Sequence, residues 1–152
     1  MTAVLQRINN ATVFADGILS GEVGQGLYIL LGVKKGDTQE DARLLCEKIS
    51  KLRIFSDENG KMNLSVFDIN GEAMVVSNFT LQANYAHGNR PDYFDAAPPT
   101  EAEALYDYFT ELLGQKLKKV ATGKFGADMR TEMSTDGPVT IVMDSDVLKK
   151  KK

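Results

Sequence analysis

The order of strand-like and helix-like segments constrains the fold of this chain more than any other feature of its sequence. Strand patterns occur from Ala3 to Phe14, in LYILLGV, in AMVVSNFTL and in the region after Gly126, with two helical patterns between them. Strand and helix do not alternate regularly, which argues against a doubly wound sheet. We therefore predict a single α+β domain with a mainly antiparallel, barrel-like sheet and two helices.

The first helix is predicted to open at Thr38, a residue type that caps helix N-termini. Three- and four-residue spacing then places one apolar stripe on a single face: Ala42, Leu45, Ile49 and Leu52.

The second helix follows the segment PPTEAE, which has the pattern of a capping box. Thr100 would be the cap, with Glu103 reaching back to it, and Gly114 would lie near the end. The predicted buried stripe is Leu105, Tyr108, Phe109 and Leu112.

Composition narrows the class of protein. The chain has 152 residues, 43% hydrophobic and 26% charged, which fits one folded domain. Cys46 is the single cysteine, so no internal disulfide and no Cys/His zinc site is expected, and a reducing compartment is indicated. The N-terminus lacks a signal-peptide core, and the longest apolar run, Leu27 to Val33, is too short to span a bilayer. We expect a cytoplasmic protein without membrane contact, metal or cofactor.

The net charge of −3 hides an asymmetry along the chain. Gly114 to Lys152 contains nine Lys and Arg against five Asp and Glu, a balance of +4 that leaves −7 on the preceding residues. A basic face on an acidic body is therefore possible, and it would suit a nucleic-acid partner. The lysines Lys149 to Lys152 either belong to this face or form a solvated tail.

Turn-forming residues interrupt the last strand pattern. The segment STDGPVT contains Gly137 and Pro138 directly before an apolar run. Glycine tolerates positive φ, and a bond before proline can be cis at modest cost. An ordinary hairpin turn is the simplest interpretation, and an unusual backbone with a function is the alternative.

Polar residues also end the buried pattern VVSNFTLQAN. Ser77, Asn78 and Thr80 occupy positions where the apolar pattern would continue, and they could simply satisfy backbone groups at a strand end. A hydroxyl nucleophile needs an adjacent base, and the only histidine, His87, lies in a loop-like Gly/Asn/Pro segment. A Ser-His-Asp hydrolase is thus weakly supported, and no phosphate loop or G-x-S-x-G elbow is present.

Several motifs in order along the chain resemble one family, the D-aminoacyl-tRNA deacylases. They are LQRI, RIFSDENGKMN, VVSNFTL, GNRPDYF, AEALYDYF, GKFGADM and DGPVT. Two positions depart from the family pattern. Asn78 replaces the glutamine of a Ser-Gln-x-Thr motif, and Thr135 replaces an asparagine that usually begins the second motif.

The resemblance implies hydrolysis of the ester between a D-amino acid and tRNA, with glycyl-tRNA as a candidate further substrate. It also implies a homodimer with active sites at the subunit interface. Gly137 and Pro138 would form a cis peptide that enters the partner's site and rejects L-amino acids. Arg7 would brace these carbonyls with its guanidinium donors, unless it is only a surface charge on an edge strand.

For catalysis, the resemblance marks Thr80, with Ser77 nearby, as nucleophile or polar participant. The backbone N–H groups of Phe79 and Thr80 are candidate oxyanion donors. Alternatively the 2′-hydroxyl of the terminal adenosine assists, which we favour because no base next to Thr80 is evident. Asn78 belongs to the same substrate-binding motif. Phe79 and Met129 resemble positions lining an adenosine pocket, although both types are common in cores.

Three interpretations follow from these motifs. Residues 1–148 form an enzyme with a lysine tail at 149–152, or a module that binds the tRNA end without ester chemistry, or a purely structural dimer. The departures at Asn78 and Thr135 are the best argument for the second. Cleavage of D-aminoacyl-tRNA separates the first from the second.

Overall fold

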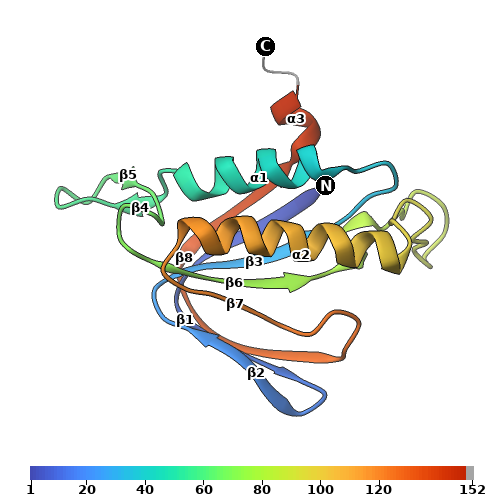
Figure 1. Cartoon of the computed structure of the whole chain (residues 1–152), viewed down its shortest axis with the longest axis horizontal. Helices are drawn as coiled ribbons and strands as arrows, with labels where there is room; N and C mark the ends of the chain where they lie inside the picture. Colours follow the sequence, from blue (N-terminus) through green and yellow to red (C-terminus); the bar gives the residue numbers. More distant parts are fainter. Residues whose placement is uncertain (150–152) are drawn as a thin grey trace.

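A computed structural model describes residues 1–149 of the chain (Figure 1). Its elements are β1 (Thr2–Ala15), β2 (Ile18–Val23), β3 (Gly26–Gly32), α1 (Gln39–Lys51), β4 (Phe55–Ser56), β5 (Met62–Leu64), β6 (Glu72–Ser77), the 3-10 helix η1 (Phe79–Gln82), α2 (Pro99–Lys116), β7 (Val120–Thr122), β8 (Met129–Asp144) and α3 (Ser145–Lys149). The predicted α+β class is confirmed. The two predicted helices are α1 and α2, and the prediction missed the short α3 and η1.

The long strand β1 organises the sheet. Along one edge it pairs antiparallel with β8 over nearly its whole length, and along the other it pairs antiparallel first with β3 and then with β2. Beyond β3 the pairing becomes parallel, with β6 next to β3 and β7 next to β6. The sheet is therefore mixed, because β3 to β6 and β6 to β7 are joined by crossovers that contain α1 and α2.

The sheet curls until its two edges approach each other. The hydroxyl of Ser20 on β2 donates a hydrogen bond of 2.8 Å to the carbonyl of Thr122 on β7. Figure 1 shows α1 and α2 side by side over one face, while β1, β2, β7 and β8 curl together below them. The barrel is nearly closed by this contact.

Two apolar cores result, one under the helices and one inside the curl. Alternate residues of β3 point to different cores: Leu27, Ile29 and Leu31 lie under the helices, whereas Tyr28 lies inside the curl. This two-sided burial explains the uninterrupted apolar run LYILLGV, which a strand with one face in water would not need.

Helix α1 begins as the sequence predicts. Thr38 is the N-cap, and its N–H donates to the Asp41 carboxylate at 2.8 Å. Ala42, Leu45 and Ile49 are buried, and Leu52 lies at the C-cap, partly buried.

Helix α2 differs from the prediction at its start and on its buried face. The N-cap is Pro98, not Thr100, because Pro99 is favourable in the first turn, where no N–H is needed. Among its predicted stripe only Phe109 is fully buried. The buried residues are Ala102, Tyr106, Phe109 and Leu113, while the other predicted positions pack partly buried at the edge of the core.

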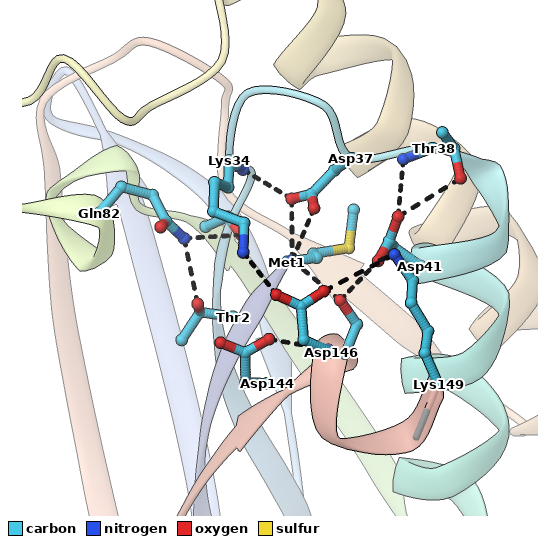
Figure 2. A network of polar contacts seen from close by, with 12 residues as sticks. Met1, Thr2, Lys34, Asp37, Thr38, Asp41, Gln82, Asp144, Asp146 and Lys149 are labelled. Carbon is cyan, nitrogen blue, oxygen red and sulfur yellow. Dashed lines mark hydrogen bonds and ion pairs between the residues drawn. The ribbon is translucent and has the colours of Figure 1, made fainter. Parts of the chain in front are cut away.

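A polar network ties the ends of the domain together (Figure 2). The Met1 ammonium is buried and lies 2.8 Å from Asp37, and the Ser145 hydroxyl donates to Asp41 at 2.7 Å. Burial opposes ionisation of Asp41, but hydrogen bonds from Lys149, Ser145 and the Thr38 backbone outweigh it and lower the pKa of that carboxyl. Lys149, assigned above to a tail, is thus part of α3 and of this network, with its Nζ 2.7 Å from Asp41.

Lys150–Lys152, the rest of the predicted tail, lie outside the described residues. No helix within residues 1–149 has the length and apolarity needed to cross a membrane.

Candidate active site

The candidate site begins where β6 ends. Ser77 is the last residue of β6, and the chain turns immediately into η1 with Asn78 as its N-cap. The Asn78 N–H donates to the Leu31 carbonyl on β3 at 2.9 Å, so the turn is fixed to the neighbouring strand. The side-chain oxygen of Asn78 accepts from the Thr80 N–H at 3.2 Å and from the Thr80 hydroxyl. Asparagine is well suited to this role because its short side chain reaches the N–H two residues ahead.

Gly32 allows η1 to lie this close to β3. A Cβ atom at this position would come within 2.9 Å of the Leu81 Cβ and 3.0 Å of the Asn78 carbonyl oxygen. Any larger residue would therefore push η1 away from the sheet.

A pocket of about 770 Å³ opens beside this turn. It is lined by Val33, Lys35, Ser77, Asn78, Phe79, Tyr93, Phe94, Ala96, Ala97, Pro98, Pro99, Ala102, Phe125, Gly126, Ala127, Asp128 and Met129. Four residues singled out in the sequence thus meet here: Ser77, Asn78, Phe79 and Met129. Its volume lies in the range of pockets that take nucleotide-sized ligands.

Aromatic side chains form much of the pocket wall. Phe79 is 59% exposed and meets Tyr93 edge-to-face, with ring centroids 5.1 Å apart. Phe94 is also exposed. Backbone hydrogen bonds between Asn84 and Asp92 close the intervening loop. Sequence reasoning did not single out Tyr93 or Phe94, although the motif GNRPDYF contains both.

Within residues 1–149, no base lies beside the hydroxyl of Thr80. It is exposed, and it donates to an amide oxygen, which does not accept the proton as a base would. His87 is exposed in the 84–92 loop, as its sequence context predicts, and does not line the pocket. The arrangement therefore offers no Ser-His or Thr-His pair for nucleophilic catalysis.

One backbone donor remains for a ligand at the turn. The Thr80 N–H already bonds to Asn78, so it is not available as an oxyanion donor. The Phe79 N–H belongs to the first turn of η1, where no intrahelical acceptor exists, and within residues 1–149 we find no other acceptor for it. Of the two predicted donors, only that of Phe79 can meet a carbonyl oxygen.

The other predicted residues lie elsewhere in the chain. The Gly137–Pro138 peptide is cis, and both residues are exposed on β8. Arg7 donates from Nε to the Asp136 carbonyl at 3.0 Å and from a terminal nitrogen to the Ile54 carbonyl at 2.8 Å. Arg7 thus braces the residue before Gly137. None of these residues lines the pocket of its own chain.

The pocket contains few charges. Lys35 is its one cation and Asp128 its one carboxylate among the described lining residues. Nowhere in residues 1–149 do three His, Cys, Asp or Glu side chains gather as metal ligands would. The arrangement can therefore hold a largely apolar ligand with one acidic group near Lys35.

Known proteins have sequences similar to that of this chain. A family model described as D-Tyr-tRNA(Tyr) deacylase matches residues 4–144. A D-aminoacyl-tRNA deacylase of Thermotoga petrophila is 51% identical over 97% of this chain and 99% of its own length. One from Caldicellulosiruptor saccharolyticus is 53% identical over 95% of this chain and 97% of its own.

Solved structures agree on the fold. A structure described as "c-Myc DNA Unwinding Element Binding Protein" superposes with a TM-score of 0.89 at 40% identity, covering 95% of this chain and 98% of the other. A probable eukaryotic D-amino acid tRNA deacylase, 15% identical, has a TM-score of 0.82 over 95% of this chain and 100% of its own, a likeness of fold. With a matching family model over 4–144 and relatives above 50% identity along almost the entire chain, this protein belongs to the D-aminoacyl-tRNA deacylase family.

Proposed function

We propose that this chain hydrolyses the ester bond of D-aminoacyl-tRNA in the cytoplasm, releasing the D-amino acid and tRNA and so proofreading translation. The observation that supports this most is the pocket beside Ser77–Phe79. These motif residues line it together with aromatic side chains, and the Phe79 N–H is free to bind a ligand there. Such a cavity suits the terminal adenosine and its aminoacyl group. Glycyl-tRNA would fit the same site, since glycine has no side chain to exclude.

The chemistry needs little from the protein, since an aminoacyl ester is already activated. The Phe79 N–H would stabilise the developing oxyanion, and the pocket would position the ester. The 2′-hydroxyl of the terminal adenosine assists attack by water. Thr80 serves the site by holding Asn78 and the turn in place, because its hydroxyl already donates to that side chain.

Selection against L-amino acids would come from a second copy of the chain. Gly137 and Pro138 are exposed and lie outside their own pocket, so only a partner subunit could present them to it. β8 also exposes apolar side chains that a dimer would cover: Val142 is 72% exposed and Met133 is 37% exposed. Arg7 would keep the Asp136 carbonyl, and with it the following pair, in position.

Cleavage of matched D- and L-tyrosyl-tRNA by the purified protein tests the proposal. We expect rapid release of D-tyrosine and negligible release of L-tyrosine. Tight binding of tRNA without cleavage of either ester would instead favour a tRNA-end binding module, the alternative that Asn78 raises by departing from the family's glutamine.

A further inference from the structure

Two adjacent lysines just after β3, Lys34 and Lys35, have different environments. Lys34 is neutralised, with its Nζ 2.7 Å from the Asp146 carboxylate. Lys35 lines the pocket, its side chain is exposed, and no carboxylate within residues 1–149 pairs with it. The charge of Lys34 is therefore used within the fold, whereas the charge of Lys35 is available to a ligand in the pocket.

The backbone around Lys35 is fixed on both sides. Its N–H donates to the Asp95 carbonyl at 2.9 Å, which joins it to the aromatic wall. On the other side, the Asp37 carboxylate accepts from the Lys34 N–H at 2.6 Å and binds the buried Met1 ammonium at 2.8 Å. Figure 2 shows the Asp37 carboxylate between the Lys34 backbone and Met1, while the Lys34 side chain reaches Asp146. Lys35 thus extends from a backbone that hydrogen bonds connect to the pocket wall on one side and to the Met1 network on the other.

We propose that Lys35 binds the phosphate on the 5′ side of the terminal adenosine of the tRNA, and so anchors the tRNA end in the pocket. This inference rests on the proposed function. A pocket that pairs aromatic faces with one unpaired ammonium matches a nucleotide, since the base stacks and the phosphodiester takes the cation. Asp128, the lining carboxylate, would repel a phosphate, which leaves Lys35 as the pocket's own anchor for it.

Binding of two small probes tests the contact without requiring catalysis. Adenosine and adenosine 5′-methylphosphate differ by one singly charged phosphodiester. We expect the phosphate to tighten binding to the native protein about five-fold, as a partly exposed charge-assisted contact would. Lys35→Gln should abolish that difference, and Lys35→Arg should retain it.

Lys61→Gln is the matched control. Lys61 is exposed in the β4–β5 hairpin, and the hairpin lies at the end of the molecule opposite the loop that contains residues 84–94 (Figure 1). This variant should preserve the five-fold preference. Equal binding of both probes by the native protein, a preference that survives in Lys35→Gln, or no binding of either probe would overturn the proposal.

Single-turnover cleavage of D-tyrosyl-tRNA connects the contact to function. In Lys35→Gln the enzyme concentration giving half the maximal rate should rise about five-fold with an unchanged maximal rate. The slope of log affinity for tRNA against log salt concentration should fall by about 0.7. An unchanged half-saturating enzyme concentration would overturn the anchoring role. Absence of cleavage by the native protein would refute the proposed function, while the probe measurements would still judge the phosphate contact.

Discussion

The Thr80 hydroxyl is engaged in capping a short helix, and this engagement determines what the residue can do in a reaction. Its proton points to the Asn78 side-chain oxygen, so the oxygen of Thr80 is not activated for attack. The same contact explains why asparagine works at this position: it caps η1, a role that residue type favours.

Thr80→Val should therefore retain deacylation within about ten-fold of the native rate, whereas losing an acid-base or nucleophilic group usually costs about 10²- to 10⁴-fold or more. A tRNA ending in 2′-deoxyadenosine should be cleaved far more slowly than normal tRNA by the native enzyme. Single-turnover rates on both tRNAs measure this. An inactive Thr80→Val together with equal rates on the two tRNAs would restore Thr80 as nucleophile.

Cys46 gives a second prediction for a single residue. It is fully buried on α1, and burial raises the pKa of its thiol to about 11. Because the thiolate is the reactive form, the native protein should not react with a disulfide reagent at pH 8. One thiol per chain should appear after denaturation. Labelling of one thiol per native chain, as fast as that of a free thiol in solution, would contradict this burial.

Among the elements, α2 was predicted correctly as a helix, but its buried face was not. Its existence follows from the pattern, but its buried face includes Tyr106, whose hydroxyl donates to the Val75 carbonyl at 2.8 Å. The acceptor belongs to β6, and helical periodicity has no information about it. For this reason a neighbouring stripe through Tyr108 looked equally buried in the sequence.

The candidate site likewise combines residues that the sequence identifies with residues that it does not. Ser77, Asn78 and Phe79 are contiguous, so a motif identifies them together. Lys35 and Tyr93 reach the same pocket from separate loops, brought together by the hydrogen bond between Lys35 and Asp95. Such contacts depend on tertiary packing, and no local pattern in KKG distinguishes Lys35 from Lys34.

The network between α1 and α3 predicts a pH effect. Asp41 has a folded-state pKa below its ordinary value of 3.8, so the unfolded chain binds more protons between the two values. The stability that Asp41 contributes is complete above pH 3.8 and is lost as the pH falls toward the folded pKa. Asp41→Asn should cost about 2 kcal/mol of unfolding free energy at pH 7.

Denaturant titrations between pH 2 and pH 7 would measure both effects. Asp41→Asn should show a shallower loss of stability below pH 4 than the native chain. Glu40→Gln is the control, because Glu40 is an exposed neighbour on α1 whose one ion pair within residues 1–149 is with Arg43, at 3.5 Å. Identical acid slopes for the native chain and Asp41→Asn would disprove the contribution of this carboxylate.

For the whole molecule, mixing two inactive variants tests the proposed exchange of residues between subunits. Ala127→Trp should fill the pocket of its own chain, and Gly137→Trp should obstruct the pocket of the partner. A mixed dimer would then contain one native site out of two. Since half the dimers in an equal mixture are mixed, about a quarter of native activity should return.

Each variant alone, treated in the same way, should stay inactive and serves as the control. Native mass spectrometry would confirm that mixed dimers form. If mixed dimers form and the mixture remains inactive, Gly137 does not act in the partner's site.

The pairing of β1 with β8 has a consequence for synthesis on the ribosome. β1 emerges long before its longest partner, β8, which begins only at Met129. Until β8 has emerged, β1 retains an unpaired edge along almost its entire length. A nascent chain would thus expose a strand able to pair with a neighbouring polypeptide, and chaperone protection during translation would favour correct completion. Closure requires contacts of high sequence separation, so folding should be slow compared with that of a helical domain of equal length.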